Sequence, residues 1–442
     1  MKKALRFSSI VCALAVSVMA NSAMLLADEP RWLYAFIPLL IGVCLLAGTF
    51  PLRAASLRWK ISGHGVALLA AFGLSVCLSV AYHVVLAIVL LPERVWAFIR
   101  SVLVCVGVEA LVFWVGIVCV YLASVQLGIK QRVVGILCGM IPIANLFALA
   151  TIIRTVLAEV CFETEKEQLD RARRAQRLCE TRYPILLVHG VFFRDTAYFN
   201  YWGRIPATLE RNGATIYYGN HASAASVADS AAQLTDRIKE IIEQSGCEKV
   251  NIIAHSKGGL DCRYALNKPG VAPYVASLTT VNTPHRGCLF ADYLLEKVPA
   301  AMKNKVASVY NAALKKFGEE NPDFLAAVGD LTAEFCERFD RETPAPAGVF
   351  CQSVGSLLPK ASGGQFPLNF SHHLVRWFDG ANDGLVSEQS FAWGEKHTLL
   401  TTAKPRGISH GDVIDLNRQN IEGFDVREFY VTLVSDLKNR GL

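Results

Sequence analysis

The sequence lacks several patterns that would assign it directly to a class of protein. Its 13 cysteines are scattered, without a disulfide framework and without the close Cys or His spacing of a zinc site. The 44 basic and 38 acidic side chains give a net charge of +6 that is spread along the chain, so no basic stripe suggests a nucleic-acid partner. No internal repeat or low-complexity segment is present, which excludes a repeat architecture.

Charged residues are scarce in the first third of the chain, and residues 33–50 contain none. Five apolar runs of roughly membrane-spanning length occur there, at residues 7–27, 33–50, 65–91, 101–123 and 133–153. These runs predict a region of all-α transmembrane helices over residues 1–153, with four to five helices. The number depends on the first run, because its basic start and its small residues near the end also fit a cleaved signal peptide. The second run follows closely, which favours an uncleaved signal anchor.

Lysines and arginines in the short loops indicate which side of the membrane each loop faces. They are frequent before the first run, after the second and after the fourth: Lys2, Lys3, Arg6, Arg53, Arg58, Lys60, Lys130 and Arg132. The other loops contain Arg31 and Arg94, with Arg100 at the edge of a run. With the N-terminus inside and five spans, this pattern predicts a multi-pass cell-membrane protein whose C-terminal domain is extracytoplasmic. Four further basic residues closely follow the last run and argue against this orientation: Arg154, Lys166, Arg171 and Arg173.

Two ionisable residues, His83 and Glu109, lie inside predicted spans. An ionisable group at membrane depth points to function. A single acid without a relay partner, however, favours a structural hydrogen bond between helices. Pro142 and Asn145 in the last run predict a kink.

The composition changes after the last apolar run. Residues 154–182 combine good helix formers with charges of both signs, which predicts a charged helical connector. From residue 183 onward, short apolar runs alternate with helical stretches. The predicted strands are Ile185–Val188, Thr215–Tyr218, Val250–Ile253, Ser277–Val281 and Val349–Val354, and the predicted helices cover 226–244, 257–267 and part of 412–438. This alternation predicts one α/β domain over residues 183–442, built on a doubly wound, mostly parallel sheet.

The stretch around Ser256 carries the most specific signal. The apolar run Val250–Ile253 leads through Ala254 to the serine, and a helix follows at 257–267. A strand, a sharp turn on a serine and a helix form a nucleophile elbow, in which small residues such as Ala254 and Gly258 leave room for the turn. The alternative is a helix N-cap serine in an ordinary loop.

A serine hydrolase of this architecture also needs backbone N–H groups to hold the oxyanion. One comes from the loop after an early strand and the other from the residue after the nucleophile. The strand Ile185–Val188 runs into His189-Gly190, so the predicted oxyanion hole consists of the amides of Val191 and Lys257. The alternative is a plain turn at His189-Gly190.

The acid and the base should follow the serine in that order. Asp383 lies in an Asn-Asp-Gly turn before an apolar pair, with Asp379 as the second choice, although Asn-Asp-Gly is also a common turn signal. His410 follows the acid and precedes the last helix, with His397 as the alternative. A neutral imidazole takes the proton of the serine hydroxyl, and a buried carboxylate holds that imidazole in the right tautomer.

With these residues in place, the C-terminal domain resembles the bacterial triacylglycerol lipase family of α/β-hydrolases. The matching stretches are LLVHG (186–190), AHSKGG (254–259), VNTPHRG (281–287), NDGLVS (382–387) and SHGD (409–412). The resemblance implies a carboxylic ester hydrolase with Ser256 as nucleophile, Asp383 as acid, His410 as base, and the amides of Val191 and Lys257 as oxyanion hole. It implies nothing about the membrane region.

The chain departs from the family pattern at two points. Ala254 replaces the usual first glycine of the elbow, as in other members. Many secreted members bind a structural calcium ion through two aspartates, one of them two residues after the catalytic histidine. Asp412 fits that place, but no aspartate between Val354 and Phe378 could be its partner. No cofactor is therefore expected to be required, and calcium is left open.

Two segments bear on substrate access. Six aromatic residues follow the oxyanion loop, for which core packing is favoured over acyl-chain binding: Phe192, Phe193, Tyr198, Phe199, Tyr201 and Trp202. Residues 288–347 form a long insertion between two strands, with helical patches at Leu294–Val306 and Pro322–Arg338. This insertion is predicted to be a cap or a mobile lid.

The sequence therefore predicts a membrane-anchored serine hydrolase that cleaves carboxylic esters of lipids through an acyl-enzyme on Ser256. A glyceride or phospholipid is the expected substrate, because it partitions into the bilayer beside the enzyme. An acyltransferase or a phospholipase would use the same triad. A noncatalytic binding module is disfavoured by the complete set of candidate residues. Only Glu109 and His83 favour an accessory domain of a transporter or sensor.

Overall fold

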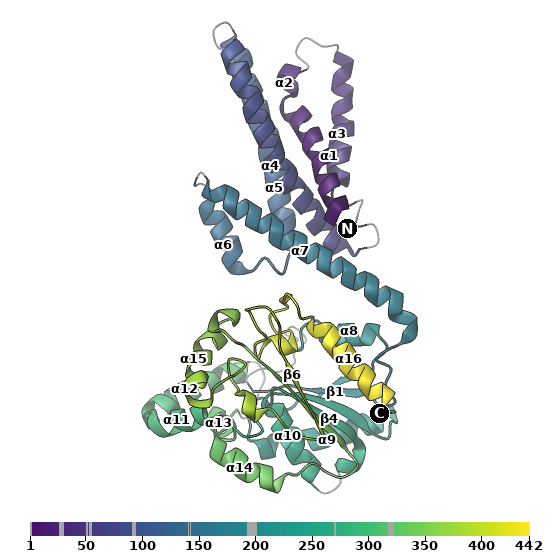
Figure 1. The fold of residues 1–442 in the computed structure, drawn as a ribbon, viewed down its shortest axis with the longest axis vertical. Helices are drawn as coiled ribbons and strands as arrows, with labels where there is room; N and C mark the ends of the chain where they lie inside the picture. The colour runs from purple at the N-terminus through teal and green to yellow at the C-terminus, as the bar shows by residue number, and fades with distance from the viewer. Residues whose placement is uncertain are drawn as a thin grey trace. The chain divides into compact units, whose positions relative to one another are not determined.

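The computed structural model describes residues 2–25, 31–49, 52, 55–90, 94–139, 141, 143–191, 201–268, 271–316 and 322–442. The chain divides into two compact units, Met1–Ala172 and Arg173–Leu442 (Figure 1). The boundary falls within residues 154–182, where the sequence predicts a connector.

Unit 1 is entirely helical. Its elements are α1 (Lys2–Ala20), α2 (Ser22–Leu25), the 3₁₀ helix η1 (Arg31–Phe36), α3 (Ile37–Leu46), α4 (Leu57–Leu90), α5 (Val95–Ala123), α6 (Ile129–Cys138) and α7 (Ala144–Arg173). Among the described residues, four helices are long and apolar enough to cross a membrane, at Lys2–Ala20, Leu57–Val89, Val95–Ala123 and Ala144–Gln176. The second apolar run of the sequence forms the shorter pair η1 and α3 instead, which together extend about 27 Å.

The long helices α4 and α5 approach closely at two glycines. A Cβ added to Gly65 would lie 3.0 Å from the carbonyl oxygen of Gly116, and one added to Gly116 would lie 3.3 Å from that of Gly65. Small residues at such a crossing let two backbones pack directly against each other, which is the main source of helix association in a bilayer. The backbones of α4 and α5 therefore pack directly against each other at this crossing.

Helix α7 differs from the predicted fifth span. Residues 133–153 do not form one helix, because α6 ends at Cys138 and a new helix, α7, begins at Ala144. Helix α7 then continues without interruption into the predicted connector. The apolar residues Ile152, Val156 and Val160 of α7 pack in one cluster with Leu5, Leu52, Trp59 and Val120. Leu5 and Trp59 begin α1 and α4, and Val120 ends α5. We call this end of the helices the basal end.

Two carboxylates of α7 also bind groups at the basal end. Glu159 accepts hydrogen bonds from the backbone N–H of Val125 (2.9 Å) and from the Ser124 hydroxyl, just after α5. Glu167 accepts from the indole of Trp59 (2.8 Å) and the N–H of Ser56 (3.0 Å), at the start of α4. Residues 152–167 of α7 therefore lie across one end of the bundle rather than along it, as Figure 1 also shows.

Unit 2 is built on a six-stranded parallel sheet with strand order β2-β1-β3-β4-β5-β6. The strands are β1 (Ile185–Val188), β2 (Ile216–Tyr218), β3 (Val250–His255), β4 (Val275–Val281), β5 (Phe350–Ser356) and β6 (Lys396–Leu400). The predicted doubly wound α/β fold is confirmed. The edge strand β6 is missing from the prediction, because its residues Lys396-His397-Thr398 are polar or half exposed and give no apolar run.

Helices cover both faces of this sheet, and the alternating side chains of each strand supply two cores. Ile185 and Leu187 of β1 pack with α8 (Ile205–Arg211) and α16 (Val426–Asn439). Leu186 and Val188 pack with α9 (Val227–Ser245) and α10 (Lys257–Asn267). The insertion between β4 and β5 contains α11 (Leu289–Lys297), α12 (Ala300–Lys316), α13 (Phe324–Gly329) and α14 (Ala333–Glu342), and α15 (Leu368–Asp379) follows β5 (Figure 1).

The strand order reverses between β1 and β3, since β2 pairs with β1 on one side and β3 pairs with it on the other. Loops at the carboxyl ends of these two strands leave in opposite directions and open a crevice, the usual ligand site of such sheets. Val191 follows β1 and Ser256 follows β3, so the predicted oxyanion loop and nucleophile meet at this point.

Candidate active site

Ser256 occupies a strained turn between β3 and α10. Its backbone has φ 55° and ψ −134°, a conformation that costs a non-glycine residue on the order of 1–3 kcal/mol. Three hydrogen bonds hold it there. The N–H of Ser256 donates to the carbonyl of Val281 (2.9 Å), and its carbonyl accepts from the Thr283 hydroxyl (2.8 Å) and the N–H of Gly259 (3.0 Å). Such a strained serine, fixed from a neighbouring strand, is the geometry of a nucleophile elbow.

Glycines allow the neighbouring segments to come close to Ser256. A Cβ at Gly258 would lie 2.3 Å from the carbonyl oxygen of His189, which explains the need for a small residue at this position. A Cβ at Gly190 would lie 2.7 Å from the Cβ of Ser256. The loop before Val191 therefore passes directly beside the serine. The next four predicted aromatics, Phe192, Phe193, Tyr198 and Phe199, lie outside the described residues.

Lys257 begins α10, so its backbone N–H belongs to the electropositive end of a helix that starts at the nucleophile. Its side chain has a different environment. The ammonium donates to a carboxylate oxygen of Asp261 (2.7 Å) and to the Ser230 hydroxyl (3.2 Å), and both charged groups are buried. Burial raises the pKa of Asp261 to about 6, and the neighbouring Lys257 opposes this shift. The ammonium of Lys257 is thus held by α9 and α10, and only its backbone is a candidate for the oxyanion hole.

Asp383 and His410 form a direct pair. Nδ1 of His410 donates to Oδ2 of Asp383 at 2.6 Å, and the N–H of His410 donates to the Asp383 carbonyl at 2.9 Å. The other carboxylate oxygen, Oδ1, accepts from the N–H groups of Leu385 and Val386, both at 2.8 Å. Asp383 is fully buried. A carboxylate held in this way fixes the imidazole tautomer that leaves Nε2 free to accept a proton.

Sequence analysis gave no role to Asn282, which completes this carboxylate site. It follows β4 in a left-handed conformation with φ 48°. Its amide donates to Oδ2 of Asp383 (2.5 Å) and to the Ser356 hydroxyl (2.7 Å). Two signals were available: its place at the carboxyl end of a central strand, where functional residues of parallel sheets gather, and its position in the matching stretch VNTPHRG (281–287).

A second histidine lies behind the site. The ring of His255 packs 4.5 Å from that of His410, and its Nε2 donates to the carbonyl of His410 (3.2 Å). Its Nδ1 accepts from the Tyr201 hydroxyl (2.6 Å), whose oxygen accepts from the N–H of Gly190 (3.1 Å). Burial, and then the nearby His410, hold the pKa of His255 well below its ordinary value. Tyr201 thus joins the oxyanion loop to the elbow and to the loop of His410, which is a positioning role that sequence analysis missed.

The two alternative residues have other partners. The carboxylate of Asp379 accepts from the backbone N–H of Leu289 (3.1 Å) and lies at the start of α11. His397 lies on the edge strand β6, where its Nδ1 contacts the Ser353 hydroxyl at 2.9 Å. The structure therefore brings Ser256, Asp383 and His410 to one edge of the sheet and gives Asp379 and His397 structural contacts.

Asp412, the weak candidate for a calcium ligand, is bound by other groups of the chain. Both of its carboxylate oxygens accept from the guanidinium of Arg406, at 3.1 Å, and one also accepts from the backbone and hydroxyl of Ser409. This cation and these donors already use the oxygens that calcium would need. Within the described part of the chain, no cluster of three or more His, Cys, Asp or Glu side chains could hold a metal ion.

Comparison with known proteins gives a consistent set of relatives. No family model matches the chain. It is 34% identical over 220 residues to the triacylglycerol lipase of Pseudarthrobacter phenanthrenivorans, which covers 46% of this chain and 66%, just under two thirds, of that lipase. It is 33% identical over 245 residues to the triacylglycerol lipase of Vibrio cholerae, covering 50% of this chain and 77% of that one. Among solved structures, the mature lipase from Bacillus licheniformis is 25% identical with a TM-score of 0.42, over 57% of this chain and 91% of that chain.

Proposed function

Because this chain belongs to the triacylglycerol lipase family of α/β-hydrolases, we propose that it is a serine hydrolase that cleaves carboxylic esters of lipids. The observation that carries the proposal is the buried pair of Asp383 and His410 beside the strained Ser256.

In the proposed mechanism, Nε2 of His410 takes the proton of the Ser256 hydroxyl as its oxygen attacks the ester carbonyl. The N–H groups of Val191 and Lys257 stabilise the negative oxygen of the tetrahedral intermediate. His410 then returns the proton to the leaving alcohol, which leaves an acyl group on Ser256. Water, activated in turn by His410, releases the fatty acid and restores the serine. Besides the ester and water, this mechanism uses only side chains and backbone N–H groups of this chain.

Exposed apolar side chains in unit 2 support a lipid substrate. They concentrate on α11, α12 and α15, and include Tyr293, Met302, Val309, Phe370 and Trp377. Helices α11 and α15 pack together through Tyr293 and Phe378, whose rings are 4.9 Å apart. Large apolar residues exposed in a group indicate contact with a membrane, a lipid or another protein.

A substrate panel tests the proposed activity. We expect the full-length protein in detergent micelles to release fatty acid from tri-, di- and monoacylglycerols faster than from phosphatidylcholine, with Ser256→Ala as the inactive control. Added glycerol distinguishes hydrolysis from acyl transfer, because a transferase would form new acylglycerol instead of fatty acid. A folded wild-type protein that releases no acid from any of these esters would contradict the proposal.

We also propose that the hydrolase unit lies on the same side of the membrane as the N-terminus. The N–H of Gly48 donates to the Ser8 hydroxyl (2.9 Å), so η1 and α3 return to the basal end. Four passes, namely α1, η1 with α3, α4 and α5, therefore end there. Glu167 holds the end of α7 at Ser56 and Trp59, and Arg173 follows six residues later, within about 9 Å along a helix.

Basic residues support a cytoplasmic basal end. Lys2, Lys3, Arg6, Arg58, Lys60, Lys130 and Arg132 all belong to helix ends and loops on that side. Arg154, Lys166 and Arg171 lie on α7 and now agree with the positive-inside rule instead of opposing it. This proposed orientation differs from the extracytoplasmic domain that the sequence analysis predicts, because that prediction counts residues 133–153 as a fifth span.

Reporter fusions test this orientation. In a bacterial host, a fluorescent protein fused after Leu442 is expected to fluoresce, and alkaline phosphatase at the same site is expected to be inactive. Fusions after residue 92, between α4 and α5, are the matched control and should show the opposite pattern. Active phosphatase after Leu442 would place the hydrolase unit outside.

A further inference from the structure

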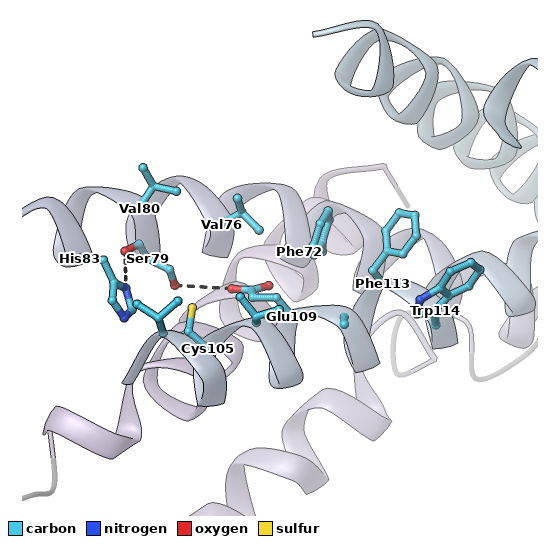
Figure 2. A pocket seen from close by; sticks show the side chains of 12 residues that line it. Phe72, Val76, Ser79, Val80, His83, Cys105, Glu109, Phe113 and Trp114 are labelled. Carbon is cyan, nitrogen blue, oxygen red and sulfur yellow. Dashed lines mark hydrogen bonds between the residues drawn. The ribbon is translucent and has the colours of Figure 1, made fainter. Parts of the chain in front are cut away.

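The proposed mechanism makes no use of a pocket in unit 1. It has a volume of about 440 Å³ and lies between α4 and α5. Most of its lining is apolar or aromatic, including Phe72, Val76, Val102, Val106 and Phe113. Figure 2 shows Glu109 in the middle of this lining, with Phe72 and Phe113 on one side and Ser79 and His83 on the other.

Glu109 is only partly satisfied by its neighbours. The hydroxyl of Ser75 donates to Oε1 at 2.5 Å, which is the interhelical hydrogen bond that the sequence led us to expect, and the Ser79 hydroxyl lies 3.5 Å from the same atom. The residue is more than nine-tenths buried. Its second oxygen, Oε2, has no hydrogen-bond partner among the described residues. A buried polar atom without a partner costs about 1–3 kcal/mol, so a group that supplies one would bind favourably.

The other polar side chains around Glu109 direct their hydrogen bonds to Oε1 or to one another, and not to Oε2. Asn21, just after α1, donates to the Ser79 hydroxyl (2.9 Å), and Ser17 of α1 donates to the Ser75 hydroxyl (3.1 Å). These serines use their own protons toward Oε1. The network therefore positions Glu109 from three helices and leaves the remaining carboxyl oxygen for a ligand.

The depth of Glu109 limits the chemistry of that ligand. Glu109 is the central residue of α5, about 21 Å from either end of the helix. The hydrocarbon core of a bilayer is about 30 Å thick, so this position lies near its centre. A charged headgroup would be strongly disfavoured at that depth, whereas an uncharged lipid is not. For the same reason a carboxyl without a cationic partner is held as the neutral acid, and it can then donate its proton.

We propose that the pocket between α4 and α5 binds an uncharged acylglycerol, whose ester carbonyl accepts a hydrogen bond from Glu109 and whose acyl chain lies along Phe72, Val106 and Phe113. The site is distinct from the one at Ser256. Binding there would hold an acylglycerol in the part of the chain that crosses the bilayer.

Photocrosslinking tests the site without any ester cleavage. The full-length Ser256→Ala protein is placed in phosphatidylcholine vesicles with a diacylglycerol that carries a diazirine in one acyl chain, and the crosslinked peptides are mapped by mass spectrometry. We expect crosslinks on the pocket-lining residues of α4 and α5. Unlabelled diacylglycerol should compete for them, and additional phosphatidylcholine should not.

Variants identify the interaction. Glu109→Leu is expected to lower pocket crosslinking about five-fold, the effect of losing one hydrogen bond, and Glu109→Gln should retain it because an amide also donates. Val106→Trp should block the pocket, and Val118→Trp, an exposed position of α5 outside it, is the matched control. Equal crosslinking in Glu109→Leu, Val106→Trp and the parent protein would overturn the proposal, and so would crosslinks spread evenly over the lipid-facing surface. The result is independent of the hydrolase activity.

Discussion

Replacing Ser256 with alanine is expected to lower kcat for ester hydrolysis by roughly four to six orders of magnitude. Ser256 follows His255, whose ring packs against that of His410, and a Cβ added to Gly190 would lie 2.7 Å from the Cβ of Ser256. Alanine removes the attacking oxygen and leaves the oxyanion hole intact, so only a small rate from binding and polarisation should remain. The measurement is kcat on a short-chain nitrophenyl ester, together with labelling by a fluorescent fluorophosphonate.

The control for this loss is another serine of unit 2. Ser245→Ala, at the end of α9 and on the opposite edge of the sheet, should label and hydrolyse like the wild type. Labelling that persists in Ser256→Ala would show that a different residue is the nucleophile. The proposed mechanism would then fail, while the family assignment would stand.

Asp383→Asn is expected to lower kcat by about 10⁴-fold with little change in folding. The two backbone N–H groups of Leu385 and Val386 need an oxygen at Oδ1, which forces the new amide nitrogen into the place of Oδ2. There it meets two donors, Nδ1 of His410 and the amide of Asn282. His410 would avoid this contact between two donors by adopting the tautomer with its proton on Nε2. That nitrogen could then no longer accept the proton of Ser256.

The matched variant is Asp379→Asn, the second choice of the sequence analysis. Because the carboxylate of Asp379 contacts the start of α11, we expect a small loss of stability and nearly normal kcat. Both variants should be compared by kcat on the same ester and by thermal unfolding. A larger loss of kcat in Asp379→Asn than in Asp383→Asn would reverse the assignment of the acid.

The site illustrates how a local pattern can predict tertiary geometry. The strained turn at Ser256 can be predicted from adjacent residues, because only small neighbours such as Gly258 permit it. The parallel sheet explains why the serine, the acid and the histidine can meet, since the carboxyl ends of its strands share one edge. Their order along the chain came from the hydrolase pattern. Asn282 and Tyr201 could not be assigned in this way. Their partners, Asp383 and His255, are far away in the chain, so the stretch VNTPHRG and the aromatic group that contain these residues did not reveal their roles.

The amino-acid sequence by itself determined the apolar helices of the first third and the doubly wound sheet, because hydrophobic period acts over a few residues. It also predicted Ser256, Asp383 and His410 as catalytic residues, from the elbow pattern and from the order of acid and histidine after the serine. Only the tertiary structure decided that Asp412 pairs with Arg406 and that the carboxylate of Asp379 accepts a hydrogen bond at the start of α11. It also decided that α7 lies across the basal end. The reason is that an apolar helix has the same composition whether it crosses a bilayer or packs on other helices. The contacts of the helix, such as the hydrogen bond between Trp59 and Glu167, distinguish these two arrangements. Such contacts form only when the chain has folded.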